Sequence, residues 1–169
     1  MISKVLIDAL RHAEIFSGLS PMQITEIARH AERLMYQPDQ VIARSGDASG
    51  GAILIIESEV ERVAGHVRLS RQRLPIGTLI GEMAMFTEFD HGASFVARSP
   101  VKAMRITRDA MLAQMADDPE LAARLLQTVA GRLREVAVDL AAAGHLQLAD
   151  VDDANDSEQS PGVRITEGS

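Results

Sequence analysis

The chain has 169 residues, 46% of them hydrophobic and 24% charged, which suits one globular domain with a hydrophobic core and a short appendage. It contains no cysteine, and this excludes disulfides, thiolate metal ligands and a cysteine nucleophile. With four Phe, one Tyr and no Trp, it also lacks the aromatic platforms on which single-stranded nucleic acids stack.

The net charge of −7 is concentrated at the C-terminus. Residues 147–169 are rich in Asp and Glu and poor in large apolar residues, so we expect an acidic, disordered tail. A solubilising role for it is favoured over a partner-binding one. The N-terminus shows no signal-peptide core, and no run reaches the roughly eighteen apolar residues of a membrane helix. We therefore expect a cytoplasmic protein with no membrane partner.

Two helices are predicted before any strand. Ser20, Pro21 and Gln23 form a capping-box start with proline in the first turn, so a helix is expected from there to about Arg33. A preceding amphipathic helix is predicted over residues 2–15, because apolar residues recur there at steps of three and four: Val5, Leu6, Ala9, Leu10 and Ala13.

Short strand-like runs separated by turn residues follow the helices. Several strands at such regular intervals are typical of a sandwich, jelly roll or barrel. The predicted strands are 34–36, 41–43, 52–56, 60–63, 67–69, 78–80, 94–97 and 101–106.

Helices return after the strands. Thr107 is expected to cap a short helix, and Asp118 and Pro119 to begin a long one that runs to about Ala143 and stops at Gly144. Its apolar residues form one stripe, longer than a small barrel can cover, so the surplus is expected to face a partner helix in a dimer. Packing of the whole stripe on its own barrel is the alternative. The stripe consists of Leu121, Leu125, Val129, Leu133, Val136 and Leu140.

The stretch Gly77 to Ala97 has the composition of a phosphate-binding loop. Gly81, Ala84, Gly92 and Ala93 are small enough to let backbone N–H groups approach an anion. The carboxylate of Glu82 can accept hydrogen bonds from sugar hydroxyls. These residues predict a pocket for a sugar phosphate.

This stretch resembles the phosphate-binding cassette of cyclic nucleotide-binding domains of the catabolite activator and kinase regulatory-subunit type. The resemblance covers Ile15 to about Gly144, and it includes the motifs Ile15–Ser20, Val41–Asp47 and Ile53–Val60. It implies an α+β fold in which N-terminal helices, an eight-stranded jelly-roll barrel and a long C-terminal helix follow in that order.

The resemblance also assigns roles within the cassette. Glu82 matches the ribose-binding glutamate, and Gly81, Ala84, Gly92, Ala93 and Ser94 match positions near sugar and phosphate. Met83 and Met85 alternate around them and are expected mainly in apolar packing, although Met83 belongs to the predicted binding segment. A short helix starting near Met83 would point its N-terminal amides at the anion. Base contacts come from the terminal helix in this family, where Gln127 and Thr128 are the polar candidates.

His91 stands where the family carries an arginine that pairs with the cyclic phosphate. Neutral histidine offers one N–H donor in place of a permanently charged fork. Three interpretations follow. The domain binds a cyclic nucleotide weakly, or more tightly when His91 is protonated. An arginine from a neighbouring strand, such as Arg98, Arg71 or Arg73, replaces the missing one. Or the pocket has lost nucleotide binding or changed ligand, with His91 an ordinary surface side chain.

Other chemistry is not indicated. The five histidines lack the spacing of a metal site, and no nucleophile elbow or P-loop is present, so neither a metal, a cofactor nor an enzymatic activity is predicted. Many bacterial relatives carry a helix-turn-helix after the long helix. Only an acidic segment follows Gly144 here, and no nucleic-acid partner is expected.

The sequence thus predicts a cyclic nucleotide-binding-like domain over residues 1–146 and an acidic tail over 147–169. Within the domain we expect a helical lead-in at 1–33, a barrel at 34–106 and C-terminal helices at 107–144. The predicted function is a regulatory sensor of cAMP or cGMP that signals through its C-terminal helix as a homodimer, with an unidentified protein partner. The alternative is a domain that binds no nucleotide and serves as a protein-interaction or dimerisation module.

Overall fold

The computed structural model describes residues 4–57, 60–63 and 71–155. Two helices come first, α1 (Lys4–His12) and α2 (Pro21–His30), with the short 3-10 helix η1 (Glu14–Phe16) between them. The predicted capping box is confirmed, because the Gln23 N–H donates to Ser20 Oγ at 3.2 Å and the Ser20 N–H donates to Gln23 Oε1 at 2.9 Å. Helix α2 ends before the predicted end at about Arg33, since the chain is already extended at Ala31 and a strand begins at Glu32.

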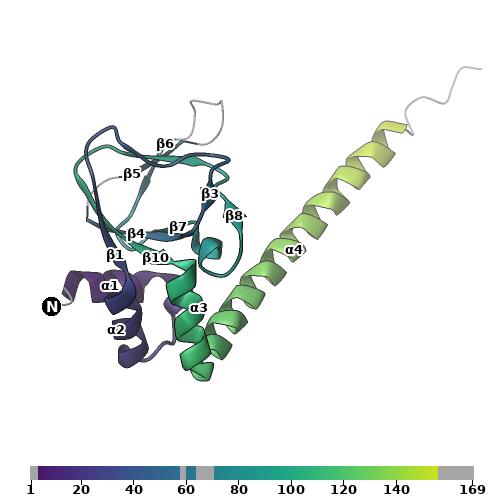
Figure 1. The fold of residues 1–169 in the computed structure, drawn as a ribbon. Coiled ribbons are helices and arrows are strands. Elements are labelled where there is room, and N and C mark those ends of the chain that lie inside the picture. Colours follow the sequence, from purple (N-terminus) through teal and green to yellow (C-terminus); the bar gives the residue numbers. More distant parts are fainter. Residues whose placement is uncertain (1–3, 58–59, 64–70, 156–169) are drawn as a thin grey trace, which may run out of the picture. The chain divides into compact units, whose positions relative to one another are not determined.

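The strands are antiparallel and lie in three sheets (Figure 1). One sheet has the order β1-β10-β4-β7, a second has β2-β9-β5-β6, and β3 pairs with β8. The bounds are β1 Glu32–Tyr36, β2 Val41–Ala43, β3 Ala48–Ser49, β4 Gly51–Glu57, β5 Val60–Val63, β6 Arg71–Leu74, β7 Leu79–Ile80, β8 Phe89–Asp90, β9 Ser94–Ala97 and β10 Val101–Thr107.

The expected eight-stranded barrel is therefore not what the described residues form: they contain ten short strands in three sheets. Seven of the predicted strands overlap observed ones, and the predicted strand at 67–69 lies outside the described residues. The strands that the pattern missed are β3, β6 and β8. Two of these have only two residues, too few for an alternation to be recognised.

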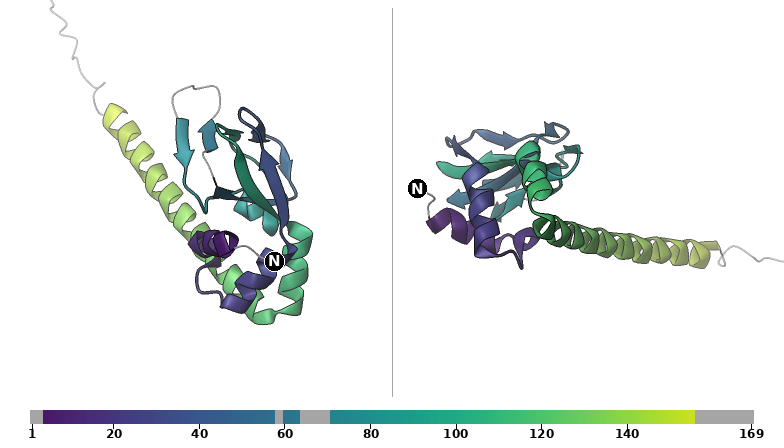
Figure 2. Two further views of the ribbon diagram at one scale, coloured as in Figure 1. Left: turned by 90° about the vertical axis from the view of Figure 1, so that its left-hand side faces the viewer. Right: turned by 60° about the horizontal axis from the view of Figure 1, so that its bottom comes forward.

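The hydrophobic core lies between the two four-stranded sheets. Ile53 and Ile55 of β4 and Ala103 of β10 face Val60 of β5 and Ala97 of β9 across it. The opposite face of the first sheet is covered by helices, with α1 packed on β4 and α3 on β10 (Figures 1 and 2). Period-2 alternation explains this two-sided burial, because Leu54 and Met104 point away from the core and are still buried.

Two helices end the chain, α3 (Arg108–Asp117) and α4 (Pro119–Asn155). Both predicted caps are confirmed: Thr107 Oγ1 accepts from the Ala110 N–H at 3.2 Å, and Asp118 Oδ1 accepts from the Leu121 N–H at 3.0 Å. The predicted stop at Gly144 is wrong, and so is disorder over 147–155, because α4 continues to Asn155. A glycine inside a helix costs only about 1 kcal/mol, and Ala and Leu, which favour helices, flank it on both sides.

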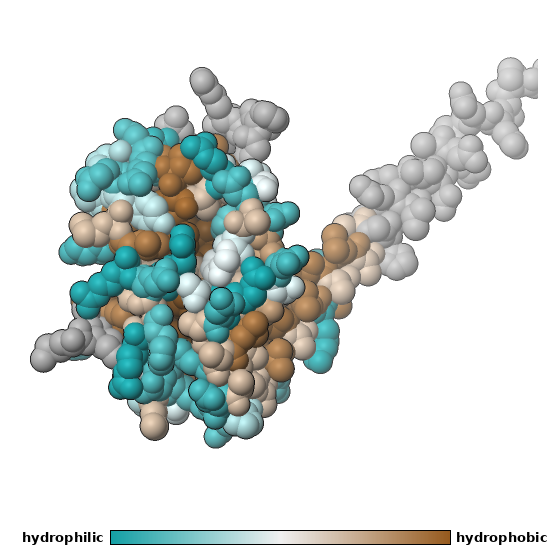
Figure 3. All heavy atoms as spheres, in the orientation of Figure 1, coloured by the Kyte–Doolittle hydropathy of each residue, from teal (hydrophilic) through white to brown (hydrophobic). Residues whose placement is uncertain are grey.

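The chain divides into two compact units, residues 1–128 and 129–169, each described by itself. The division falls within α4, earlier than the predicted boundary at residue 146. In the second unit, apolar side chains of the helix are exposed, among them Leu133, Val136 and Leu140 (Figure 3). Within the described residues, no helix is long and apolar enough to cross a membrane.

Candidate functional site

The stretch predicted to bind a phosphate folds as a strand, a short helix and two further strands. After β7, Gly81 adopts a left-handed conformation with φ of 67°, and the 3-10 helix η2 (Glu82–Met85) follows. The Ala84 N–H donates to the Gly81 carbonyl at 2.9 Å, which closes the turn. The chain then passes through β8 and His91 to Gly92 and β9. The sequence predicted a short helix near Met83, and η2 confirms it.

A partly buried arginine contact holds η2 in place. Ala84 and Met85 are fully buried, so the predicted packing role of Met85 is confirmed, whereas Glu82 and Met83 are half-buried. The guanidinium of Arg108, at the start of α3, donates to the Ala84 carbonyl at 3.2 Å and to the Ser49 carbonyl at 3.0 Å. Arg108 was not among the predicted site residues, since nothing local in the sequence ties it to the cassette.

His91 is buried, not a surface side chain: only 7% of it is exposed. Its imidazole lies directly against Gly81, where an added Cβ would come within 2.9 Å of His91 Cε1. Its backbone N–H donates to the Asp47 carbonyl at 3.1 Å, and its own carbonyl accepts from the Gly46 N–H at 2.8 Å. The ring of Phe89 contacts it edge-on, with centroids 6.2 Å apart. The surface interpretation is therefore wrong.

The surroundings of His91 favour its neutral form. Burial lowers the pKa of the imidazole below its ordinary value of 6.5, and the carboxylates of Asp47 and Asp90 offset this only in part. Near pH 7 the site consequently presents a neutral ring with one N–H donor. A permanent positive charge for an anion at this site has to come from a residue other than His91.

The arginines that accompany His91 are not those the sequence suggested. Arg98 forms ion pairs with the buried carboxylate of Glu61 and with Asp39, the latter at 2.7 Å. Arg73 lies exposed on β6, and the side chain of Arg71 lies outside the described part. Instead, Arg44 and Arg105 line a hollow of about 270 Å³ together with His91.

The sequence held a signal for one of these two arginines. Along β10, Val101 and Ala103 face the core, and alternation places Arg105 on the same face, opposite Ile53 of β4. Arg44 precedes the turn whose Gly46 and Asp47 backbones bond to His91. Arg44 comes close to His91 only because residues far apart in the sequence bond to each other there, and no local sequence pattern indicates this.

The remaining predicted residues fall into two groups. Gly92 is exposed with open space around it, Ala93 is buried, and Ser94 Oγ accepts from the Ser45 N–H at 3.0 Å. These three residues directly follow His91 in the chain. Gln127 and Thr128 lie on α4 instead, where the Thr128 hydroxyl donates to the Arg124 carbonyl at 3.1 Å. Neither is among the residues that line the hollow at His91.

The site offers backbone and guanidinium donors but no metal ligands in a cluster. Among the residues whose side chains the structure describes, no three His, Asp or Glu are grouped so as to hold a metal ion. The hollow with Arg44, His91 and Arg105 can accommodate an anion, and Glu82 lies half-buried in η2 of the same cassette. This chemistry suits binding of a sugar phosphate.

Known proteins share the fold of this chain. A family model described as the cyclic nucleotide-binding domain matches residues 33–118, just over half of the chain. The N-terminal domain of a transcriptional regulator from Streptomyces coelicolor A3(2) has the same fold, with a TM-score of 0.70 and 23% identity over 79% of this chain and 95% of that one.

Two regulators are similar in sequence. The cyclic AMP receptor protein of Thermus thermophilus is 26% identical over 78% of this chain and 62% of its own length. The CRP-like cAMP-activated global transcriptional regulator of Mycobacterium tuberculosis is 29% identical over 79% of this chain and 61% of its own length. The chain thus spans about three fifths of the length of these relatives. The expectation that it has no nucleic-acid partner stays a prediction.

The matched family is one of binding domains, and the similar proteins are regulators, not enzymes, in agreement with the predicted lack of enzymatic activity. The motifs at Ile15–Ser20, Val41–Asp47 and Gly81–Ser94 led to the same family from the sequence alone. By its sequence and its fold, the chain belongs to the cyclic nucleotide-binding domain family.

Proposed function

We propose that this chain is a regulatory module that binds a cyclic nucleotide, cAMP or cGMP, and passes the signal on through its C-terminal helix. The observation that carries the proposal is the cassette from Gly81 to Ser94, in which the left-handed Gly81 packs against the buried His91. In this proposal the ribose hydroxyl binds Glu82, and the phosphate binds near Gly92 and Ala93.

Charge decides how tightly such a ligand binds. A charge-assisted hydrogen bond contributes about 1.5–3 kcal/mol, which corresponds to about 10- to 150-fold in affinity. Because His91 is buried and its pKa lies below the ordinary value, the bond that an arginine would make at this position is missing near pH 7. We therefore expect weak binding, with Arg44 and Arg105 as the fixed charges on the same hollow as His91.

Calorimetric titration with cAMP and cGMP at pH about 6 and about 7.5 tests the proposal, because the two values bracket the ordinary pKa of histidine. A phosphate favours protonated His91, so the affinity should rise as the pH falls. The absence of heat at millimolar concentrations of either nucleotide, at both pH values, would overturn the sensor function.

Signalling through the helix requires that the nucleotide bind two conformations of the protein with different affinities. Amide hydrogen exchange of α4 with and without ligand measures this. If the nucleotide binds and the exchange of α4 is unchanged, the ligand does not act through that helix. Homodimerisation through the exposed apolar residues of α4 is part of the same proposal.

The alternative is a domain that binds no nucleotide and acts as a dimerisation or protein-interaction module. The burial of a neutral His91 in the anion site favours it, and so do Leu133, Val136 and Leu140, which are exposed on α4. A stable dimer that gives no heat when titrated with cAMP or cGMP would support this alternative.

A further inference from the structure

A groove lies where α2, the end of α3 and the start of α4 meet. Helices α2 and α3 pack against each other (Figure 1), and Gln23 of α2 donates from its side chain to Asp118 Oδ2 at 2.9 Å, at the junction of α3 and α4. The groove has a volume of about 400 Å³, within the range of small-molecule sites, about 300–1,000 Å³. It shares no lining residue with the hollow at His91.

The lining of the groove is acidic. It includes no lysine or arginine, and its four carboxylates come from α2, the end of α3 and the start of α4: Glu26, Asp117, Asp118 and Glu120. Glu26 pairs with Arg29 of its own helix at 2.9 Å. Glu120 pairs with Arg124 of α4 at 3.0 Å. The negative charge that is left in the groove therefore belongs to the two aspartates between the helices.

Asp117 is the carboxylate without a partner. The part of the chain that the structure describes offers it no hydrogen bond and no ion pair. It ends α3, where the helix dipole already places partial negative charge, and no basic residue lies in that last turn. Asp118 follows directly, and hydrogen bonds from the Leu121 N–H and the Gln23 side chain lower its pKa, so it is ionised as well. A cation at this end of α3 would reduce the repulsion between these charges.

A buried acceptor in the lining is also unsatisfied. Gln114 of α3 donates from Nε2 to the Glu26 carbonyl at 3.4 Å, and the same atom lies 3.1 Å from His30 Nδ1. Gln114 Oε1 is buried and has no hydrogen-bond partner among the described residues. A buried acceptor without a donor costs free energy, and a donor from a ligand in the groove can supply the missing bond. The acceptor and the unpaired carboxylate both point to a cation that carries several N–H donors.

Apolar side chains complete the groove. Leu121, at the start of α4, is 2% exposed and forms part of its floor, and Met22 of α2 is 76% exposed at its rim. Methylene groups can lie along these two side chains while charged ends stay at the carboxylates, as they do in the side chain of a lysine at a protein surface. A ligand that combines ammonium groups with an alkyl chain is complementary to both features.

We propose that this groove binds a short aliphatic polyamine, a chain of methylene groups with two or more protonated amines. One ammonium binds Asp117 and Asp118 at the end of α3. A second binds across the groove near Glu26, and the methylenes lie over Leu121 and Met22. An ammonium group suits the site because its three donors rotate freely and can reach carboxylate and amide oxygens together. The site lies apart from the nucleotide cassette and does not depend on nucleotide binding.

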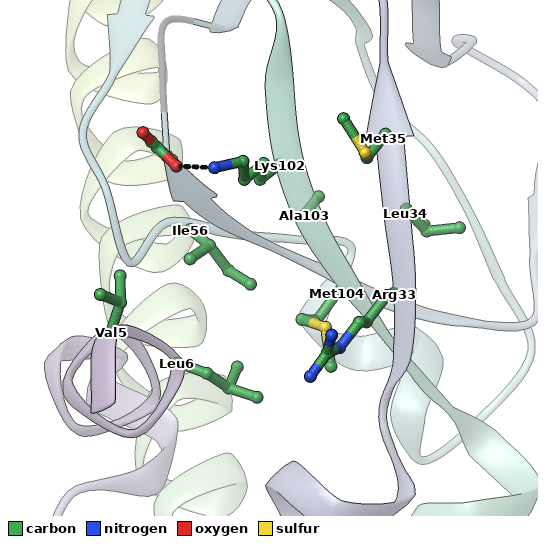
Figure 4. A pocket seen from close by; sticks show the side chains of 10 residues that line it. Val5, Leu6, Arg33, Leu34, Met35, Ile56, Lys102, Ala103 and Met104 are labelled. Carbon is green, nitrogen blue, oxygen red and sulfur yellow. Dashed lines mark ion pairs between the residues drawn. The ribbon is translucent and has the colours of Figure 1, made fainter. Parts of the chain in front are cut away.

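Methionine methyl groups report on this groove. The full chain, with its methionine methyls labelled with 13C, is titrated with spermidine while NMR follows the methyl signals. An ionic strength of about 0.15 M screens non-specific attraction to a chain of net charge −7. We expect a saturable shift of Met22. Met35 and Met104, which line a separate groove beside α1 (Figure 4), are internal controls that should not move.

A matched pair of variants tests the role of the unpaired carboxylate. Asp117→Asn should weaken spermidine binding about three- to fivefold, since it removes one exposed ion pair. Without ligand it should be no less stable than wild type, because it takes a negative charge away from the C-terminal end of a helix, so weaker binding would not reflect unfolding. Asp109→Asn, in the first turn of the same helix and outside the groove, should leave the affinity unchanged.

Several outcomes would overturn the proposal. They are an unsaturable shift of Met22, movement of Met35 or Met104 along with it, and an Asp109→Asn variant that binds as weakly as Asp117→Asn. If magnesium chloride alone produces the same saturable shift at the same concentration, the groove attracts any multivalent cation. If a trilysine peptide binds more tightly than spermidine, the occupant is a basic protein segment. Either result contradicts a polyamine site.

Discussion

His91 and Gly81 are in close packing contact. Gly81 has φ of 67°, a conformation that L-residues rarely adopt, and the space its missing Cβ would fill is taken by the imidazole. The backbone of His91 in turn bonds to the backbones of Gly46 and Asp47. The cassette is thus shaped by one contact between a glycine and a histidine.

This contact predicts the effect of adding one methyl group. Gly81→Ala should lower the free energy of unfolding by about 1–3 kcal/mol, because the new Cβ meets His91 Cε1 and the left-handed backbone becomes strained. Gly92→Ala, in open space and without a left-handed backbone, is the matched control and should change it by less than about 0.5 kcal/mol. Urea denaturation measures both. Equal losses would refute the special role of Gly81.

The low pKa of His91 makes stability depend on pH in a known direction. Below about pH 6.5 the unfolded chain protonates this histidine while burial opposes protonation in the folded state. The free energy of unfolding should therefore fall as the pH drops from about 7 through 6.5, with a contribution of at most about 1.4 kcal/mol per pH unit.

His91→Gln should remove this contribution, whereas His30→Gln, at an exposed position on α2, should not. Urea denaturation of both variants at pH about 7.5, 6.5 and 5.5 gives the comparison. A pH dependence that survives in His91→Gln would assign the effect to other groups.

The missing guanidinium can be restored. His91→Arg should tighten cyclic nucleotide binding about tenfold or more, because it adds a permanent donor pair where the wild type has a neutral ring. Calorimetry with cAMP near pH 7.5 measures the change. Arg98→Gln is a control, since Arg98 is engaged by Glu61 and Asp39, and it should leave the affinity unchanged. An unaltered affinity in His91→Arg would place position 91 outside the phosphate site.

At the scale of elements, η2 depends on α3 for its position. The guanidinium of Arg108 ties the carbonyl of Ala84, in η2, to that of Ser49, in β3. A movement of α3 would therefore reach the cassette through this side chain. In the proposed function, this is the link within residues 1–128 that joins the ligand site to the start of the C-terminal helices.

Arg108→Met tests that link, since methionine keeps much of the apolar stem and removes the donors. The free energy of unfolding should fall by about 1.5–3 kcal/mol, because two buried carbonyls lose a charged donor. Arg29→Met, in an exposed pair with Glu26, should cost less than about 1 kcal/mol. Thermal or urea unfolding measures both, and similar losses would show that Arg108 does not hold η2.

The elements that local chemistry determines were predictable. The caps at Ser20, Thr107 and Asp118 each rest on residues within one helical turn, and all three are confirmed. The strands β3 and β8 were missed because each has two residues and exists only through pairing with the other. The end of α4 was misplaced because Gly144 lies among residues that favour a helix strongly enough to continue it.

In the site, too, the features that depend on neighbouring residues were predictable and those that depend on distant residues were not. The pattern of small residues located the cassette, because its spacing is local. The burial of His91 was not predictable, since it depends on Gly81, Phe89 and the turn at Asp47 meeting around one ring. The arginines beside it come from different sheets, since Arg44 directly follows β2 and Arg105 lies on β10. Only the packing of the two sheets against each other brings them to one hollow.

At the scale of the whole molecule, the apolar stripe of α4 changes its environment along the helix. Leu121 and Leu125 are buried within residues 1–128, whereas Leu133, Val136 and Leu140 are each more than half exposed. Exposed apolar residues repeated at steps of three and four are typical of a helix that pairs with another helix. We therefore expect the chain to associate through the stripe beyond residue 128.

Light scattering at high protein concentration should accordingly give twice the chain mass of 18.3 kDa. Leu133→Lys should raise the dimer dissociation constant about tenfold or more, because burying an unpaired charge in an apolar contact costs more than about 1.4 kcal/mol. Val138→Lys is the matched control: Val138 is 66% exposed on the same helix but lies off the stripe, so its dimer should persist. A monomeric wild type would exclude the dimer, and equal weakening by both variants would mean that association does not use the stripe.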